Sequence, residues 1–219
     1  MPVPADVKGR LNAGVADERV QSKSPVGAIL AGGASLRLGR PKAVAELGGR
    51  PLISYPLAAI RAAGLEPLVV AKADSPLPPL RCRFVEEPDE PRHPLAGIVA
   101  ALHAAGGRSV VAVGCDMPFL EPALLDAFAA LEHPLALAEA RGRLQPLPGR
   151  YPPDLEAELS SALARGLSLV EITAALGARV LAEAEVARFG EPRWLYFSVN
   201  DDDDLAAAER ELSARRATC

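Results

Sequence analysis

A glycine-rich segment near the start of the chain, LAGGASLRLGRPK at residues 30–42, carries the residue types that bind phosphate. Gly32 and Gly33 can adopt positive φ and have no side chain, so backbone N–H groups there can approach an anion closely. Between residues 37 and 50 only Glu46 opposes a cluster of cations, which consists of Arg37, Arg40, Lys42 and Arg50. The pattern predicts a loop that binds a phosphate or another anion, and a glycine turn beside a solvated basic surface is the alternative.

Two common phosphate-binding motifs do not fit this segment. A dinucleotide-binding turn needs G-x-G-x-x-G opening directly into a helix, with an acidic residue about 20 positions later. A P-loop needs G-x-x-x-x-G-K-[ST], whereas here Gly39 is followed by Arg40, Pro41 and Lys42. Pro41 also prevents a helix from running unbroken through the segment, so neither motif is present.

An acidic residue follows the most apolar run of the chain. The run SVVAVG at 109–114 is typical of a strand buried on both faces, and CDMPFL at 115–120 comes directly after it. Asp116 is therefore expected at the carboxyl end of a central strand, where open α/β sheets bind ligands and where a carboxylate suits Mg²⁺. A turn cap before Pro118 is the alternative for Asp116. For Cys115 a packed thiol is favoured over a nucleophile.

Short apolar runs alternate with longer helical patterns from Pro25 onward. The strands and helices that they predict must position the glycine-rich segment and Asp116. This alternation predicts a doubly wound α/β sheet in a single domain of residues 25–216, preceded by a flexible tail of residues 1–24. Strands are expected at 26–30, 68–71, 82–86, 109–114, 134–139, 178–182 and 195–199. Helices are expected at about 51–64, 95–105, 121–131, 153–165, 168–177 and 205–215, and residues 144–151 are left unassigned.

Composition bounds the class of protein. The 219 residues are 49% hydrophobic and 24% charged, which is enough for a sizeable core. A net charge of −4 argues against general binding to nucleic acid or to an anionic membrane, so an anionic ligand needs a local basic patch. Three separated cysteines indicate neither a disulfide framework nor a zinc knuckle and fit a reducing cytoplasm. The sequence shows neither a transmembrane run nor a signal peptide.

Several motifs together resemble one enzyme family. The loop LAGG-x-S-x-R-x-G-x-x-K at 30–42 and GRPL at 49–52 look like the opening of nucleotidyltransferases with a glycosyltransferase-A-like fold. The motif CDMPFL at 115–120 resembles the acidic motif of the MobA-type molybdenum cofactor guanylyltransferases, and HPLAGI at 93–98 resembles their G-P-L-A-G-I. QPL at 145–147 with Tyr151, and Val199-Asn200 with Leu205, are similar to later family elements. The matches follow the family order from residue 26 to about 210.

The resemblance implies a three-layer α/β fold with a mostly parallel, Rossmann-like central sheet. It implies transfer of GMP from GTP to molybdopterin, with or without molybdenum, and release of pyrophosphate with Mg²⁺ as cofactor. It further implies a cytoplasmic enzyme whose product passes to molybdoenzymes or their chaperones, with no nucleic acid or membrane partner. The expected catalytic residues are Arg37, Lys42 and Asp116, the nucleotide-binding residues are Leu30, Ala31, Gly32, Gly33, Lys42, Asp89 and Asp116, and the metal ligands are Asp116 and Asn200.

The chain departs from the family pattern at several positions. His93 replaces the first Gly of G-P-L-A-G-I, Ser198 replaces an Asn, and the pair at 201–202 is Asp-Asp instead of Thr-Pro. The family places a nucleotide-contacting Asp just before G-P-L-A-G-I, and the candidates here are Glu86, Glu87 and Asp89. Asp89 is chosen because it keeps the residue type, although Glu87 better keeps the place after the strand.

These departures leave three other functions open. They are a cytidylyltransferase acting on the same pterin, a nucleotidyltransferase with another acceptor such as a sugar phosphate, and a nucleotide-binding regulator without catalysis. Asn200 has its own alternative, because it precedes the acidic residues 201–204 and an apolar helical pattern. In that interpretation, Asn200 caps a helix, the carboxylates after it interact favourably with the positive N-terminal end of the helix dipole, and no metal is bound.

Overall fold

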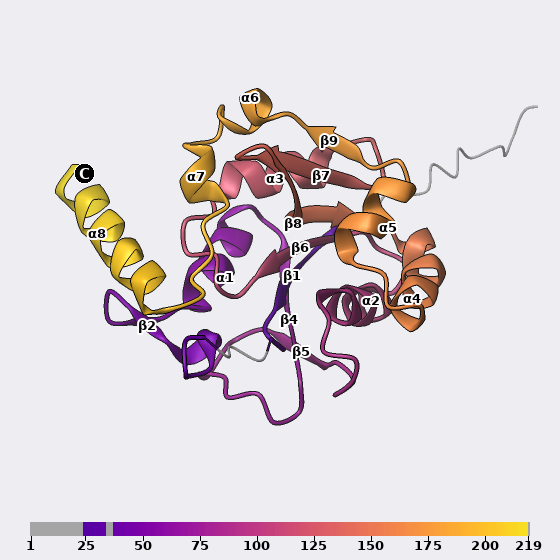
Figure 1. Ribbon diagram of the computed structural model, residues 1–219, viewed down its shortest axis with the longest axis horizontal. Helices are drawn as coiled ribbons and strands as arrows, with labels where there is room; N and C mark the ends of the chain where they lie inside the picture. Colours follow the sequence, from indigo (N-terminus) through magenta and orange to yellow (C-terminus); the bar gives the residue numbers. More distant parts are fainter. Residues whose placement is uncertain (1–23, 34–36, 219) are drawn as a thin grey trace, which may run out of the picture.

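A seven-stranded sheet forms the centre of the computed structural model, which describes residues 24–33 and 37–218 (Figure 1). The strands lie in the order β5-β4-β1-β6-β8-β7-β9, and of these only β8 runs opposite to its neighbours. Their bounds are β1 Val26–Leu30, β4 Glu66–Ala71, β5 Arg83–Glu86, β6 Val110–Gly114, β7 Ala136–Ala140, β8 Arg143–Tyr151 and β9 Arg179–Leu181. A two-stranded hairpin joins β2 (Glu46–Leu47) to β3 (Arg50–Pro51).

Helices cover both faces of the sheet, so the predicted three-layer α/β fold is confirmed. One face packs against α1 (Ser54–Ala62), α3 (Pro122–Ala130), α6 (Glu183–Val186) and α7 (Pro192–Leu195). The other face packs against α2 (Pro94–Ala105), α4 (Glu156–Ala164) and α5 (Leu169–Ala175). Short 3-10 turns, η1 (Lys42–Val44) and η2 (Pro153–Leu155), and a C-terminal helix, α8 (Asp202–Thr218), complete the described elements.

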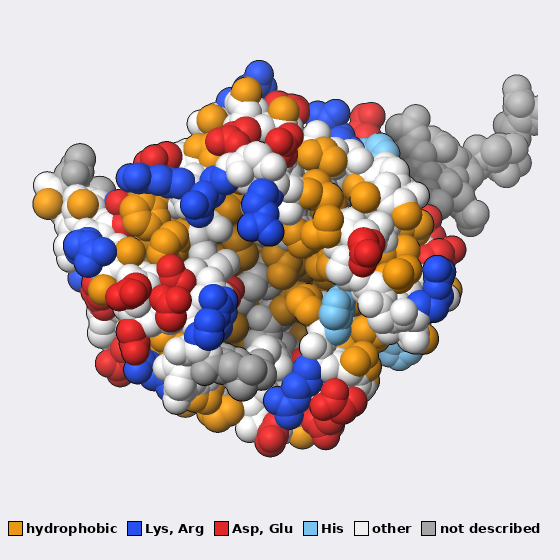
Figure 2. Space-filling view, viewed as in Figure 1, with side chains coloured by type: hydrophobic (Ala, Val, Ile, Leu, Met, Phe, Trp, Pro, Cys, Tyr) orange, Lys and Arg blue, Asp and Glu red, His pale blue; other side chains and the backbone are white. Residues whose placement is uncertain are grey.

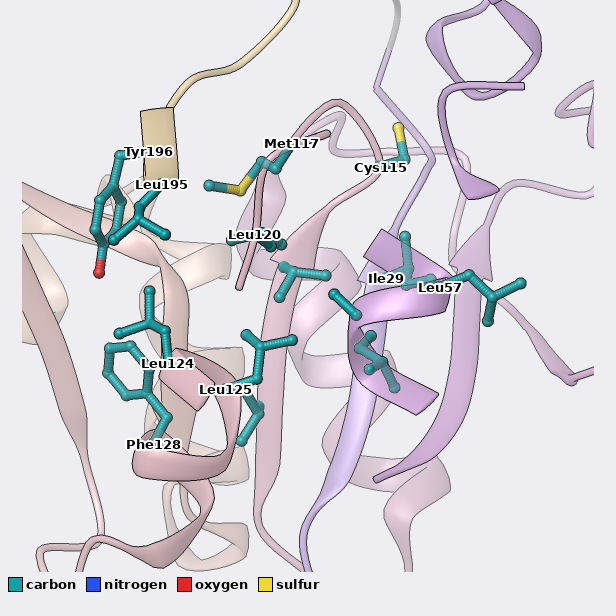
Figure 3. Packing of buried hydrophobic residues seen from close by; sticks show 14 of the residues in the cluster. Ile29, Leu57, Cys115, Met117, Leu120, Leu124, Leu125, Phe128, Leu195 and Tyr196 are labelled. Carbon is teal, nitrogen blue, oxygen red and sulfur yellow. The ribbon is translucent and has the colours of Figure 1, made fainter. Parts of the chain in front are cut away.

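The core follows from the apolar faces of these elements. In Figure 3, Leu124 and Phe128 of α3 lie close to Leu195 and Tyr196, at one side of the sheet. Every residue of β6 is buried, as the SVVAVG run predicted, because helices cover both sides of this central strand. The predicted tail, residues 1–24, lies outside the described residues apart from Ser24, and the single domain of residues 25–216 stays a prediction.

Strand β8 occupies the segment that the sequence left unassigned. Pro146 and Pro148 argue against a regular central strand, because proline donates no hydrogen bond to a ladder. In the structure the ladder is irregular at this point. Strand β8 pairs with β7 at residues 143–145 and again at Arg150, and with β6 at residues 149–151, so both prolines fall in the stretch between Gln145 and Gly149 that pairs with neither strand. The Tyr151 hydroxyl donates to the Pro146 carbonyl over 2.7 Å and closes the bulge.

The predicted strand at 195–199 is wrong. Residues 192–195 form α7, which begins with Pro192 at its first turn, and residues 197–200 have no regular structure. The apolar run suits a strand by residue type, but β9 already pairs with β7 at this end of the sheet. The run instead divides its side chains between two cores, with Leu195 and Tyr196 in the main core and Val199 in a smaller one.

The smaller core attaches α8 to the body of the protein. It contains Leu47, Leu52, Phe119, Val199 and Ala208, and α8 lies beside the β2–β3 hairpin (Figure 1). Glu209 of α8 accepts a hydrogen bond of 2.7 Å from the backbone N–H of Gly48 in that hairpin. None of the helices in residues 24–33 and 37–218 is long and apolar enough to cross a membrane.

Candidate functional site

A cavity of about 470 Å³ opens at the carboxyl ends of β1 and β6, the edge at which the sequence placed Asp116. Figure 2 shows the molecule hollowed near the centre of this view, with blue basic side chains around the hollow. We call this space the basic cavity. Its described lining residues are Leu30, Gly32, Gly33, Arg37, Lys42, Glu87, Arg92, His93, Pro94, Gly97, Gly114, Cys115, Asp116, Leu147 and Asn200.

Three residues from distant parts of the chain meet in the basic cavity. The Lys42 ammonium donates to Asp116 Oδ2 over 2.6 Å and to Asn200 Oδ1 over 2.8 Å. The side chains of Lys42 and Asp116 are each 18% exposed, so solvent screens this ion pair less than a surface pair. Lys42 begins η1, Asp116 follows β6 and Asn200 precedes α8. Two oxygen atoms, one of them anionic, therefore face a single cation.

The backbone around Asp116 fixes the direction of its carboxylate. Gly114 ends β6, and a Cβ atom there would lie 2.4 Å from Asp116 Oδ1, so only glycine lets the carboxylate fold back against the strand end. The Asp116 carbonyl accepts a hydrogen bond of 2.9 Å from the backbone N–H of Val199. This bond joins the Asp116 loop to the segment that carries Asn200.

The start of α8 holds Asn200 in place. The backbone N–H of Asn200 donates to Asp204 over 2.9 Å, and the N–H of Asp204 donates to Asp201 over 3.0 Å. The Asn200 side-chain NH₂ donates to the Ser198 carbonyl over 2.9 Å, which leaves the amide oxygen directed at Lys42. The predicted helix capping is thus present in Asp201 and Asp204, while the Asn200 side chain belongs to the basic cavity.

A buried carboxylate, Glu87, lies in a different part of the same cavity. Its side chain is 8% exposed and forms an ion pair with the buried Lys72 ammonium at 3.5 Å. A Cβ atom on Gly32 would lie 1.6 Å from Glu87 Oε1, and one on Gly97 would lie 2.9 Å from Oε2. The two glycines therefore allow the carboxylate to sit between the glycine-rich loop and α2. Burial raises the pKa of the Glu87 carboxyl, and the Lys72 ammonium opposes that rise.

Asp89, which the sequence analysis favoured for nucleotide contact, does not line the cavity and is exposed. The backbone explains the difference, because the N–H of Glu87 donates to the Ala71 carbonyl over 3.0 Å and so extends the pairing of β5 with β4. Residues 88–90 then turn outward into solvent. The position directly after strand β5 is the sequence signal that points to Glu87 as a lining residue of the cavity, whereas Asp89 was chosen by residue type alone.

The other predicted site residues divide between the cavity and its surroundings. Leu30, Gly32, Gly33, Arg37, Lys42, Asp116 and Asn200 line the cavity. Ala31 is buried beside it, and its N–H donates to the Val70 carbonyl over 2.8 Å. Arg40 instead pairs with Asp202 of α8 at 2.7 Å. The lining residues to which the sequence analysis gave no binding role are Arg92, Pro94, Gly97, Gly114 and Leu147, together with the packed thiol Cys115. His93 was noted only as a departure from the motif.

Cys115 is a packed thiol, as predicted. The residue is 7% exposed, and burial together with the neighbouring Asp116 raises the pKa of the thiol. A thiol of this kind is a poor nucleophile because it stays protonated. Within the part of the chain that the structure describes, no group of three or more His, Cys, Asp or Glu could hold a metal ion. A cation here would be held by Asp116 and Asn200 together with oxygen atoms of a ligand.

A second cavity of about 330 Å³ adjoins the first, and we call it the neutral cavity. Its described lining residues include neither Lys nor Arg; they are His93, Pro94, Gly114, Asp116, Met117, Gln145, Pro146, Leu147, Ser168, Leu169, Val170, Tyr196 and Ser198. Both cavities share His93, Pro94, Gly114, Asp116 and Leu147. The arrangement can hold a polyphosphate on one side of Asp116 and a less charged molecule on the other.

Comparisons with known proteins agree with this geometry. Residues 27–210 match the family described as "MobA-like NTP transferase domain". A molybdenum cofactor guanylyltransferase of Rhizobium leguminosarum bv. trifolii is 34% identical over 212 residues, covering 87% of this chain and 94% of the relative. One of Cereibacter sphaeroides is 34% identical over 202 residues, covering 85% and 96%. The crystal structure of molybdopterin-guanine dinucleotide biosynthesis protein A from Archaeoglobus fulgidus is similar with a TM-score of 0.73 at 23% identity, covering 86% of this chain and 98% of that one.

Proposed function

The chain belongs to the MobA-like NTP transferase family, and on that premise we propose that this nucleotidyltransferase transfers GMP from GTP to molybdopterin, with or without molybdenum. Pyrophosphate is the second product. The observation that carries the proposal is the Lys42–Asp116–Asn200 cluster at the boundary of two cavities, one basic and one neutral. The relatives named as molybdenum cofactor guanylyltransferases support the choice of substrates.

We assign the two substrates to the two cavities on the basis of charge. The basic cavity has Arg37, Lys42 and Arg92 in its lining and suits a triphosphate, and its volume of about 470 Å³ is sufficient for a nucleotide. The neutral cavity has apolar walls at Leu147, Leu169 and Val170, which suit the flat ring system of a pterin. Asp116 lines both cavities, so the reacting phosphates would meet beside it.

Asp116 and Asn200 are also the residues that would hold Mg²⁺. A carboxylate and an amide oxygen are hard donors, and Mg²⁺ commonly takes one or two protein carboxylates with substrate phosphate oxygens completing its shell. Both oxygens accept hydrogen bonds from the Lys42 ammonium, which supports the proposal that they share one cation. When bound, Mg²⁺ would neutralise charge on the phosphates. The Lys42 ammonium would then turn from these oxygens to the triphosphate.

The protein's contribution to the transfer is positioning and charge neutralisation. Backbone amides at Gly32 and Gly33 hold the nucleotide, and Arg37 with Lys42 neutralises the triphosphate. The acceptor phosphate is already an anion near neutral pH, so its oxygen can attack the α-phosphorus without a general base. The bond from that phosphorus to the pyrophosphate oxygen breaks, and pyrophosphate leaves with the electron pair.

Glu87 supports guanine as the base. Guanine presents two neighbouring donors, N1–H and the 2-amino group, and one carboxylate can accept both. Cytosine presents an acceptor at N3 beside its amino donor, so a carboxylate would repel part of its edge. Because Glu87 is buried between Gly32 and Gly97, a base reaching it would be read with little interference from water. This favours GTP over the CTP of the alternative cytidylyltransferase.

Glu87→Gln is expected to lower kcat/KM for GTP by about 10- to 100-fold, since the amide replaces one acceptor with a donor. Its effect should be smaller with ITP, which lacks the 2-amino group. Steady-state assays with both nucleotides measure this, and Glu86→Gln at the exposed neighbouring position serves as the matched control. Equal losses with GTP and ITP would contradict the contact with the 2-amino group. Thermal melting of Glu87→Gln checks that the fold tolerates the loss of the ion pair between Glu87 and the buried Lys72.

Asp204→Ala is expected to raise the Mg²⁺ concentration for half-maximal activity by about 10-fold, a typical effect of removing a group that orients a metal ligand. The physical reason is that the Asn200 backbone loses the 2.9 Å hydrogen bond that holds it. A Mg²⁺ titration at saturating GTP measures the change. Asp203→Ala removes an exposed carboxylate from the same helical turn and should leave the titration unchanged. Identical titrations for both variants would rule out the role of Asp204.

An assay of pyrophosphate release tests the proposed function directly. The protein is supplied with Mg²⁺, each of the four NTPs and either molybdopterin or a sugar phosphate as acceptor, and the product is identified by mass spectrometry. We expect release with GTP and a product larger by one GMP unit. Release with CTP would favour the cytidylyltransferase, and activity only with a sugar phosphate would favour another acceptor. No release with any nucleotide would favour the regulator. The cytoplasmic location and the receiving molybdoenzymes or chaperones stay predictions.

A further inference from the structure

His93 lies at the N-terminus of α2, and one of its two ring nitrogens already takes part in a hydrogen bond. Its Nδ1 accepts a hydrogen bond of 3.1 Å from the backbone N–H of Leu95, so the side chain caps the helix. The ring is half-buried and stands where the family motif has glycine, which has no side chain. The cap explains why the helix tolerates histidine here, but it uses only one side of the ring.

The cap determines which nitrogen carries the proton. A backbone N–H can donate only to an unprotonated ring nitrogen, so Nδ1 is the acceptor and the neutral imidazole carries its hydrogen on Nε2. The cap thereby makes Nε2–H a hydrogen-bond donor at the far side of the ring. Nε2 therefore carries its hydrogen before any ligand binds, and no other group has to supply a proton.

The position of His93 makes that donor useful. His93 lines both the basic and the neutral cavity, and among the shared lining residues that the structure describes only His93 and Asp116 have polar side chains. The Asp116 carboxylate has no hydrogen to donate to a phosphate, whereas the ring N–H of His93 has one. The neutral cavity has no Lys or Arg in its described lining, so an acceptor phosphate entering it meets few side-chain donors: His93, Gln145, Ser168, Ser198 and Tyr196, whose hydroxyl is buried.

We propose that His93 Nε2–H donates a hydrogen bond to the attacking phosphate of the acceptor and holds it at the boundary of the two cavities. This inference rests on the proposed function and adds a substrate-positioning residue to it. The acceptor oxygen forms the new bond to the α-phosphorus, pyrophosphate leaves with the electrons of the old bond, and His93 keeps its proton throughout. Its effect is to orient the acceptor phosphate and reduce its effective charge.

His93→Ser tests the proposal while keeping the helix capped, because serine is a favoured N-cap residue but does not reach the cavity boundary. We expect kcat/KM for molybdopterin to fall about 10- to 100-fold, the effect of losing one hydrogen bond to a charged group. The Kd for GTP, measured by calorimetry, should change less than twofold. His103→Ser, which alters an exposed histidine of the same helix, should change neither quantity. Unchanged molybdopterin kinetics in His93→Ser, or an equal loss of GTP affinity, would overturn the proposal.

A second measurement separates this proposal from the proposed function. Imidazole ¹⁵N spectra of the wild-type protein should show His93 protonated at Nε2 and unprotonated at Nδ1, and inorganic phosphate should shift the Nε2 signal of His93 but not that of His103. If the wild type transfers no GMP to molybdopterin, the proposed function fails while this titration still decides the role of His93. A His93 signal that phosphate does not move would refute the donor role even in an active enzyme.

Discussion

Asp116→Asn is expected to lower kcat/KM for GTP by about 10³-fold, because one carboxylate serves both cavities and the proposed metal. The asparagine side chain keeps the shape that fits against Gly114 but loses the negative charge that faces Lys42. Excess Mg²⁺ should restore little activity, since a neutral amide binds Mg²⁺ far less well than a carboxylate. Steady-state kinetics over a range of Mg²⁺ concentrations measure the loss.

The control for this variant is Asp126→Asn, which changes an exposed carboxylate on α3 away from both cavities. It should retain wild-type kinetics. Circular dichroism melts of both variants should remain close to the wild type, because Asp126 is exposed and Asp116 is only half-buried. An Asp116→Asn enzyme that keeps full activity with the wild-type dependence on Mg²⁺ would remove Asp116 from the metal site.

Lys42→Met is expected to have two opposite effects. Loss of the ammonium should lower kcat/KM for GTP by about 10²-fold, because a cation on the triphosphate is missing. The nucleotide-free variant should nevertheless bind Mn²⁺ more tightly than the wild type, since the Lys42 ammonium no longer occupies Asp116 and Asn200. In the wild type, a divalent cation at the proposed metal site would have to displace Lys42, and the displacement should cost less when the triphosphate is present to receive the ammonium.

Electron paramagnetic resonance of free Mn²⁺, with and without GTP, measures the second effect. The difference in Mn²⁺ affinity between wild type and variant should be largest without nucleotide and should shrink or reverse when GTP is bound. Arg210→Met removes a cation from the exposed side of α8 and should alter neither the kinetics nor the Mn²⁺ affinity. Equal Mn²⁺ affinity of Lys42→Met and wild type without nucleotide would contradict the competition.

The elements that the sequence predicted correctly are those whose local pattern and final environment agree. The strand at 109–114 is apolar throughout and lies in the middle of the sheet, and the helix at 95–105 ends at Gly106, which has φ of 60°. The strand at 195–199 failed because a run of large apolar residues does not reveal whether a sheet edge is available to it. Strand β8 was missed because local rules discount a strand with Pro146 and Pro148, and only the partners of β8 show that these prolines fall within a bulge.

The site was predictable where a motif sets its backbone geometry and unpredictable where partners come from afar. Lys42 and Asp116 lie in recognisable motifs, and the structure brings them within 2.6 Å. The choice between Glu87 and Asp89 depends on how far the β4–β5 pairing continues, which the sequence does not show. The pairing of Glu87 with Lys72 likewise depends on two adjacent strands, and each residue taken alone looks like an ordinary surface charge.

The aromatic residues of the smaller core give the protein an intrinsic optical probe. Trp194, the only tryptophan in the sequence, lies 5.2 Å from the Phe119 ring and 5.1 Å from the Phe197 ring. Phe119 shares a loop with Asp116, and Phe197 belongs to the segment that leads to Asn200. Indole emission responds to its immediate surroundings, and no second tryptophan obscures it. Movement of these two segments relative to each other is therefore open to stopped-flow fluorescence without an added label.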